Sequence, residues 1–282
     1  MKTGKILQAT FTAGLLAAAC TGSAHAAEWS DTTLGYRYGN QFREPFNTQD
    51  ISKNIFFLTH ASGYKYGTNF FNVDFLMSDN KDPSTRGGSG AQETYVVYRN
   101  TVDIGKVMGK DLKWGIVRGW GATFGFDWNT KNDFGYGSKK RMLVAGPTVM
   151  FDVPGFFNLS LLALDESNAP VGHPDRYRYK THAMLTGAWG IPIANTPLSF
   201  EGFFNVIAPK GNDEFGAATK TETNIDMQLM LDVGALAGGP KSTFKVGLEY
   251  QYWKNKFGND ASGPAGSGAF AKTPMIRLEY HF

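Results

Sequence analysis

The chain has 282 residues, and its 28 basic and 25 acidic side chains give a formal net charge of +3 at pH 7. Aromatic residues make up 14% of it, glycine occurs 34 times, and the mean hydropathy is −0.28. No block of like charge marks a nucleic-acid surface. After residue 20, no stretch has the roughly 18 consecutive apolar residues of a membrane helix. This composition is typical of strands that are apolar on one face and of polar loops.

The first segment has the pattern of a secretory signal peptide. Two lysines precede an apolar run at residues 6–20, and an A-x-A cleavage site ends at Ala26. We therefore expect a cleaved signal peptide at 1–26 and a single domain at 27–282. Cys20 is the only cysteine; it has some likeness to a lipoprotein processing site, but the site at Ala26 fits better. After cleavage the domain holds 28 − 2 = 26 basic and 25 acidic residues, which is nearly neutral.

Segments with period-two alternation recur along the rest of the chain. Successive side chains of a strand lie on opposite faces, so this alternation predicts a sheet with one apolar face and one polar face. We count about twelve such segments, which is within the range of outer-membrane barrels. The clearest lie at residues 34–39, 71–78, 114–128, 177–189, 198–206, 224–233, 243–253 and 273–282; those at 55–62, 93–104, 141–152 and 158–166 have no definite phase.

The last segment alternates most clearly and ends in an aromatic residue. Ile276, Leu278, Tyr280 and Phe282 share one face, while charged side chains occupy the other. An ordinary edge strand of a soluble sheet is the alternative for this segment alone. A terminal strand that ends in Phe282 favours an outer-membrane β-barrel, and it predicts that the barrel-assembly machinery recognises this strand.

The links between these segments are alternately short and long. Outer-membrane barrels have short periplasmic turns and long external loops, and an even number of strands places both chain ends on the periplasmic side. A soluble sandwich has no reason to keep its long loops on one side. The short links are 63–67, 153–157, 190–197 and 235–242, and the long ones are 40–54, 79–92, 129–140, 167–176, 209–223 and 254–272. The predicted fold class is therefore all-β, an antiparallel transmembrane β-barrel of about 12 strands of the outer-membrane type.

The sequence contains no recognisable catalytic or metal-binding motif. His60, His173, His182 and His281 are scattered, and neither H-E-x-x-H nor G-x-S-x-G occurs. We therefore predict no metal, no cofactor and no enzymatic activity. A membrane-embedded hydrolase that assembles Ser and His from adjacent strands remains an alternative, because such a site needs no local motif.

The polar face of the strands would line a lumen. Both signs of charge are present, and mixed charges with amides favour a neutral, hydrogen-bonding solute. The alternative is that these charges pair across the lumen as a structural plug. The candidates are Arg37, Phe70, Asn72, Asp74, Arg178, Lys180, His182, Glu201, Phe203, Asn205, Asn224, Asp226, Gln228, Asp232, Lys245, Glu249, Gln251, Arg277 and Glu279.

Two aromatic residues share this polar face. Phe70 has the phase of Asn72, and Phe203 has the phase of Glu201, so both are predicted to point inward. An aromatic ring in a polar lumen suits stacking against a planar base or a sugar ring. The alternative is that each ring packs against a loop that folds inward.

The chain resembles the nucleoside-specific channel-forming (Tsx-like) family of Gram-negative outer membranes. The resemblance rests on GYRYG at 35–39, GFDWNTKND at 125–133, GLEYQYWKN at 247–255 and LEYHF at 278–282. It implies a monomeric barrel of about twelve strands with a narrow channel for nucleosides. It supplies no residue-by-residue assignment of a nucleoside site.

The sequence thus predicts a passive, substrate-selective channel in the outer membrane, with nucleosides as the leading solute. A narrow channel for acidic oligosaccharides is the alternative within transport, favoured by the row of Arg178, Lys180 and His182. The hydrolase and a structural or adhesive barrel are alternatives from other classes. The expected partners are outer-membrane lipid, a small solute and the barrel-assembly machinery, with no nucleic acid.

Overall fold

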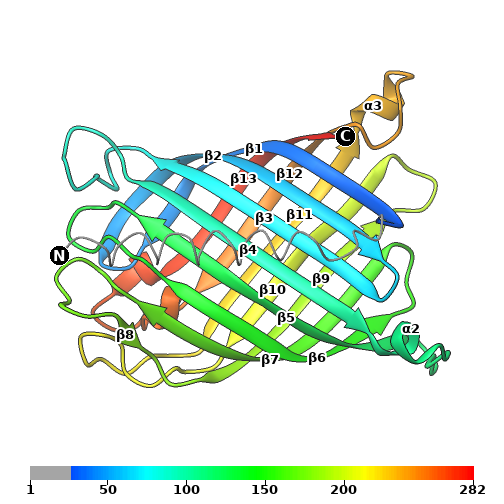
Figure 1. The fold of residues 1–282 in the computed structure, drawn as a ribbon. Helices are drawn as coiled ribbons and strands as arrows, with labels where there is room; N and C mark the ends of the chain where they lie inside the picture. The colour runs from blue at the N-terminus through cyan, green and yellow to red at the C-terminus, as the bar shows by residue number, and fades with distance from the viewer. Residues whose placement is uncertain (1–26) are drawn as a thin grey trace, which may run out of the picture.

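The computed structural model describes residues 27–282, so the predicted signal peptide lies outside the described part of the chain. Thirteen strands form one antiparallel sheet in this part (Figure 1). All except β8, which has two residues, are 10 to 18 residues long. The strands are β1 (Trp29–Glu44), β2 (Asn47–Tyr64), β3 (Gly67–Ser78), β4 (Gln92–Asp103), β5 (Val117–Lys131), β6 (Arg141–Phe151), β7 (Phe156–Asn168), β8 (Tyr177–Arg178), β9 (His182–Pro192), β10 (Leu198–Ile207), β11 (Glu222–Asp232), β12 (Phe244–Lys254) and β13 (Phe270–His281).

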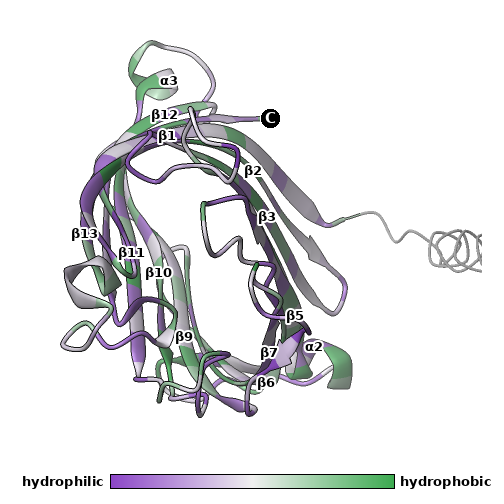
Figure 2. Cartoon of the chain, turned by 90° about the vertical axis from the view of Figure 1, so that its left-hand side faces the viewer, coloured by the Kyte–Doolittle hydropathy of each residue, from purple (hydrophilic) through white to green (hydrophobic). Residues whose placement is uncertain are grey.

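The sheet closes on itself. The first strand pairs with the last, with Leu34 opposite Tyr280, and β6 pairs with β7 at the point where the strand order would otherwise end. Each long strand therefore has two hydrogen-bonded neighbours, which removes the exposed edges of an open sheet. The predicted fold class, a closed antiparallel barrel of the outer-membrane type with twelve long strands, is confirmed. Viewed from the end that carries the loops, the barrel is oval, with β3 and β10 on its two long sides (Figure 2).

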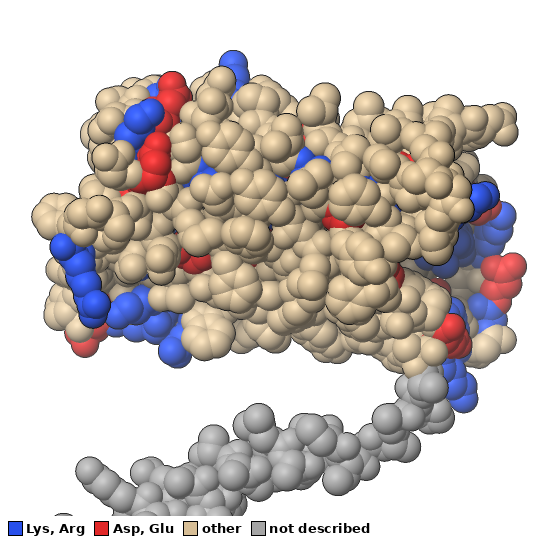
Figure 3. Space-filling view, turned by 90° about the horizontal axis from the view of Figure 1, so that it is seen from above, with Lys and Arg blue, Asp and Glu red and all other residues tan. Residues whose placement is uncertain are grey.

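The predicted alternation separates an outward from an inward face. In β13, Ile276, Leu278 and Tyr280 are exposed, whereas Met275 and Glu279 are buried. On the face shown in Figure 3, charged side chains gather at the two ends of the barrel and leave a mostly uncharged band between them. This band has the character of a surface that contacts lipid hydrocarbon.

The two ends of the barrel differ. The described ends of the chain lie at one end, together with the short turns and the helices α2 (Ile104–Met108) and α3 (Val233–Leu236); we call it the inner end (Figure 1). The longer loops lie at the other, which we call the outer end. Among residues 27–282, no helix is long and apolar enough to cross a membrane.

One predicted loop is instead a hairpin. Residues 40–54 were expected to form a long external loop, but β1 and β2 continue through this segment to a two-residue turn at Pro45 and Phe46. The register shifts between Gly39 and Phe42, and such a bulge brings Phe42 and Glu44 onto the inward face. The prediction was wrong because polar residues of a strand at a barrel mouth have the composition of a loop.

Apolar side chains fill part of the interior. One cluster contains Phe42, Ile51, Ile55 and Met275, on the neighbouring strands β1, β2 and β13. The other lies in the β6–β7–β9 wall and contains Met142, Val144, Leu162, Leu164 and Met184. The lumen is therefore narrower than its ring of backbones.

Candidate functional site: the lumen of the barrel

Most of the predicted site residues face the lumen. Side chains on their face make contacts between strands that are not neighbours, such as Arg37 of β1 with Asp74 of β3 and Glu249 of β12, and such contacts cross the interior. Cross-strand partners share this face, with Phe203 opposite Asp226. The inward residues are Phe70, Asn72, Asp74, His182, Glu201, Phe203, Asn205, Asn224, Asp226, Gln228, Lys245, Glu249 and Arg277.

Arg178 and Lys180 do not face the lumen. Arg178 lies opposite Ser167 on the outward face, its side chain is 72% exposed, and it pairs with Asp165 at 2.5 Å. Lys180 is exposed beside Gly211 of the loop after β10. The row that favoured acidic oligosaccharides therefore leaves only His182 inside the barrel, and the prediction for the other two side chains was wrong.

A bulge explains this error. The amide of Tyr179 donates to the carbonyl of Glu166, while His182 lies opposite Leu164. Three steps along one chain thus match two along the other, which is the geometry of an inserted residue. Tyr179 and His182 both point inward as a result, although an uninterrupted alternation would place them on opposite faces.

In the middle of the lumen, two arginines pack against an aromatic ring. The guanidinium carbons of Arg37 and Arg277 lie 5.1 and 4.3 Å from the ring centre of Phe57. Glu249 accepts from both, at 3.0 and 2.8 Å, and Asp74 pairs with Arg37 at 2.6 Å. The two arginines are therefore compensated, and they stiffen the wall instead of presenting free positive charge. Phe57 was missed because residues 55–62 show no clear phase.

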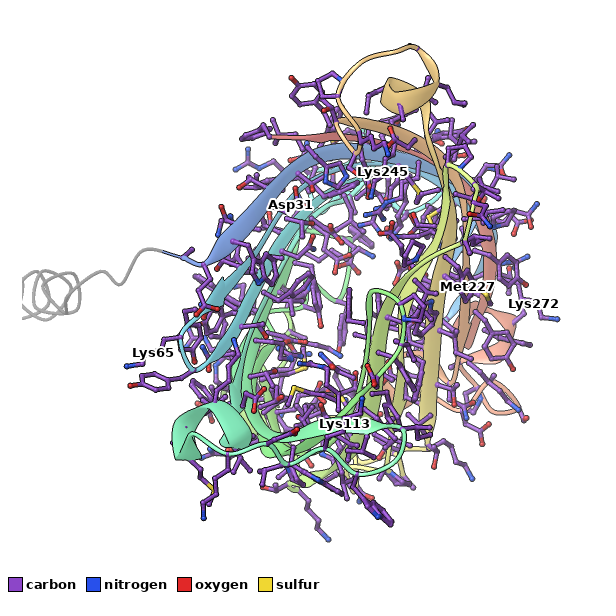
Figure 4. All side chains as sticks on the ribbon, turned by 90° about the vertical axis from the view of Figure 1, so that its right-hand side faces the viewer. Asp31, Lys65, Lys113, Met227, Lys245 and Lys272 are labelled. Atoms are coloured by element: carbon purple, nitrogen blue, oxygen red, sulfur yellow. The ribbon has the colours of Figure 1, made fainter. Side chains whose placement is uncertain are left out.

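Histidine and acidic side chains gather at the inner end. Nδ1 of His281 lies 2.9 Å from Asp31 and 3.1 Å from the hydroxyl of Thr33, and Nε2 lies 3.1 Å from Glu279. A Ser-His-Asp type of site needs the hydroxyl and the carboxylate on different ring nitrogens. Thr33 and Glu279 meet this condition, but Asp31 shares Nδ1 with Thr33 and Arg277 donates to Glu279 at 2.6 Å, so the ring is held between two carboxylates. Figure 4 shows Asp31 and Lys245 near this opening.

A first buried ion cluster lies at the outer end. Glu44 at the end of β1 accepts from Lys53 of β2 at 2.6 Å, and it pairs with Lys131 of β5 at 3.4 Å and Lys256 at 3.2 Å. Lys131 also pairs with Asp82 at 2.9 Å. Because β5 is four strands away from β1 and Lys256 follows β12, these contacts cross the mouth of the barrel.

A second cluster lies beside it. Glu166 of β7 pairs with Lys140 at 3.2 Å and with Lys210 at 2.8 Å. Glu214, in the loop after β10, accepts from the hydroxyls of Tyr136 and Tyr179, which come from two other loops. The loops at the outer end are therefore held to one another through side chains.

Phe257 joins the two clusters. The ammonium groups of Lys140 and Lys256 lie 4.0 and 5.1 Å from its ring centre. Its backbone has φ of 60°, a left-handed conformation that is strained for a bulky residue. The contacts of the Phe257 ring must therefore offset the free-energy cost of this backbone conformation. We call the joined clusters the outer plug: Glu44, Lys53, Asp82, Lys131, Lys140, Glu166, Lys210, Glu214, Lys256 and Phe257.

Burial disfavours the charged forms of three plug residues that lie outside the strands, Lys210, Glu214 and Lys256. It lowers the pKa of Lys210 although Glu166 opposes this shift, and it lowers the pKa of Lys256 although Glu44 opposes it. Burial also disfavours the charged form of Glu214, but the two tyrosine hydrogen bonds outweigh this effect and lower the pKa of its carboxyl. The plug lysines thus depend on their carboxylates to stay charged.

Two aromatic rings on the inward face of the barrel are accessible to solvent. Phe70 is 41% and Phe203 is 37% exposed, although both lie on the inward face. Asn72 and Asn205, which follow the same face, are also partly accessible. β3 and β10 lie on opposite long sides of the oval, so the rings stand on facing walls. Accessible phenyl rings with amides beside them are surfaces for a flat, hydrogen-bonding solute.

Among residues 27–282, no three or more His, Cys, Asp and Glu side chains are arranged to hold a metal ion.

The chain is similar to known proteins only in its fold. No protein-family model and no curated relative matches the chain. Similar solved structures include the translocator domain of the autotransporter NalP from Neisseria meningitidis, with 11% identity, a TM-score of 0.45 and coverage of 98% of this chain and 96% of that one. The NanC porin has 11% identity, a TM-score of 0.44 and coverage of 89% and 99%. The KdgM porin, solved in complex with disordered oligogalacturonate, has 10% identity and a TM-score of 0.43, and the match covers 89% of this chain and 99% of that one. At these values the likeness carries no argument about the solute.

Proposed function

We propose that this protein is a passive, substrate-selective channel of the outer membrane, exported by the signal peptide at 1–26 and inserted by the barrel-assembly machinery through the strand that ends in Phe282. The closed barrel, its uncharged outward band and the long loops at one end support this location. The outer end then faces the medium and the inner end faces the periplasm. The protein acts as a monomer and carries out no chemistry.

The proposed solute is a nucleoside or a similar neutral, flat molecule. The observation that carries this choice is the accessible ring of Phe203 on the lumen wall, opposite Asp226 in the register and near Asn205. The carboxylates around it already have partners: Gln251 donates to Asp226 at 3.1 Å, and Lys245 pairs with Glu201 at 3.3 Å. A wall of this kind offers stacking and hydrogen bonds but no strong field for an ion.

The location is tested by fractionation. The protein is expected in the outer-membrane fraction and should migrate faster on gels before boiling than after it, because a closed barrel resists detergent until it is heated. Recovery from the soluble periplasm would contradict the location whatever the solute is.

Phe203→Ala is expected to weaken the block of channel current by nucleosides. Stacking of a base on an aromatic ring contributes about 1–3 kcal/mol, and the low end suits a site that must release its solute, so the block should become about fivefold weaker. The measurement is a titration of single-channel current in planar bilayers with adenosine and thymidine.

Phe200→Ala is the matched control, because Phe200 lies on the same strand but on the outward face. It should leave the block unchanged. An equal block of all three proteins would remove Phe203 from the site. A block by oligogalacturonate, with none by nucleosides, would replace the proposed solute by an acidic oligosaccharide.

A further inference from the structure

Three arginines lie on the outward side of the barrel near its outer end. Arg141 begins β6 between Trp128 of β5 and Ser167 of β7, and Ser167 lies opposite Arg178 of β8. Arg176 donates to the hydroxyl of Ser167 at 3.3 Å. These strands run along the lower edge of Figure 1. We call Arg141, Arg176 and Arg178 the arginine cluster.

The positive charge of this cluster is only partly compensated. Asp165 pairs with Arg178 at 2.5 Å. Within residues 27–282, Arg141 and Arg176 form no salt bridge, and Arg176 donates instead to the carbonyl of Lys139 at 2.9 Å. Partial burial, followed by the positive charge of Arg141, lowers the pKa of Arg176, so the two guanidinium groups repel each other. The cluster therefore favours an added anion.

A shallow apolar groove adjoins the cluster on the side toward the middle of the barrel. Ala145, Ala163 and Ala183 lie opposite one another on β6, β7 and β9, and Pro147 and Leu161 extend the floor. The groove is largely open to the surface, and its volume is about 410 Å³. Along β7 it begins two residues from Asp165, which is about 7 Å in a strand.

The neighbouring side chains make this groove a depression in the lipid-facing surface. Leu143 and Leu161 are 62% and 54% exposed, and they stand beside the small residues of the floor. Trp128, at the level of the arginines, is 53% exposed and has the position of a ring at the headgroup boundary. The cluster thus lies at headgroup level, and the groove continues from it into the hydrocarbon.

The chemistry of the two parts is complementary to one kind of molecule. A guanidinium binds phosphate through two parallel hydrogen bonds, and a cationic group at the membrane surface attracts anionic headgroups. The groove is lined mainly by apolar residues, with Thr181 and His182 as its polar members, so an alkyl chain fits it better than a polar segment does. A soluble anion would satisfy the arginines and leave the groove empty, whereas a lipid occupies both.

We infer that the outward face of β6, β7 and β8 is a binding site for a lipid with a phosphate-bearing headgroup in the outer leaflet, with its phosphate on the arginine cluster and an acyl chain in the adjoining groove. The inference rests on the proposed location in the outer membrane. It is independent of the solute, because the site lies on the opposite side of the barrel wall from the lumen.

The test measures lipid binding to the purified barrel in detergent by native mass spectrometry. The probes are lipid A with two phosphates and the same lipid after enzymatic removal of its phosphates. Arg141→Gln together with Arg176→Gln should bind the phosphorylated lipid about thirtyfold more weakly than the wild type. Ala163→Trp, which fills the groove and keeps the arginines, should also weaken binding.

The control is Arg43→Gln together with Arg86→Gln, which removes the same charge from the outer end but away from the groove and should bind as the wild type does. Equal loss in this control, unchanged binding in the Arg141/Arg176 variant, or equal binding of the dephosphorylated lipid would overturn the inference. Gel mobility before boiling shows that each variant is folded. Because the assay needs no current, a channel without nucleoside block would contradict the proposed solute and leave the lipid site standing.

Discussion

Glu44→Gln is expected to lower the free energy of unfolding by about 3–5 kcal/mol, because breaking a buried ion pair leaves its partner uncompensated. The ammonium groups of Lys53, Lys131 and Lys256 all lie within 3.4 Å of this one carboxylate, and all three side chains are buried. Gln keeps the size of the side chain but removes its charge. The same variant should have a larger single-channel conductance, since the contacts that cross the mouth are loosened.

Unfolding in guanidinium, followed by tryptophan fluorescence on protein reconstituted in vesicles, measures the first effect, and planar-bilayer recording measures the second. Asp50→Asn is the control on the same hairpin: Asp50 is half exposed and pairs with Arg43 at 2.7 Å. An exposed pair contributes about 0–1 kcal/mol. If both variants lose the same stability, the plug lysines are compensated by other groups and Glu44 is not the centre of the plug.

The plug also bears on the choice of solute. Each of its five lysines has a carboxylate partner, but the five ammonium groups share only Glu44, Asp82 and Glu166, so positive charge is in excess among these pairs. A channel for acidic oligosaccharides would gain from unpaired cations along its path. The uncompensated arginines, Arg141 and Arg176, lie instead on the outward face, where they cannot act on a solute in the lumen.

Much of the barrel could be predicted from the sequence because the phase of a strand is a local property. Residues 224–233 and 273–282 alternate without interruption, and the structure places their polar side chains inward as expected. Neighbouring strands of a barrel then follow from chain order. The alternative that the candidate lumen charges pair with one another was also open from the sequence, and Arg37 pairs with Asp74 and Glu249 in this way. The pairs of the outer plug involve residues that the sequence did not single out.

The remaining parts depend on information that a local pattern does not contain. The bulge between Tyr179 and His182 adds one residue, and no residue type marks the position of the addition. Lys210 and Lys256 follow strands and have no periodicity, so only the fold shows that they meet Glu166 and Glu44. Contacts across a lumen join residues that are far apart in the chain, and alternation gives the face of each but not its partner.

The last expected result tests the two faces directly. Leu229 lies on the outward face of β11, two residues from the centre of the strand, between Phe200 and Leu248. Leu229→Arg should therefore lower the free energy of unfolding by about 2–4 kcal/mol, the cost of a cation near the bilayer midplane. Gln228→Arg places the same side chain one residue earlier, toward the lumen and beside Glu201 and Glu249.

The Gln228 variant should keep its stability within about 1 kcal/mol, because water and nearby carboxylates solvate an inward guanidinium. It should instead shift the reversal potential in a salt gradient toward anion preference, since it adds positive charge to the path of the ions. Guanidinium unfolding in vesicles and bilayer recordings of both variants separate the two effects. Equal destabilisation of the two variants, with no change in ion preference for Gln228→Arg, would mean that Gln228 does not face an aqueous lumen and that the interior of the barrel is closed to ions at this level.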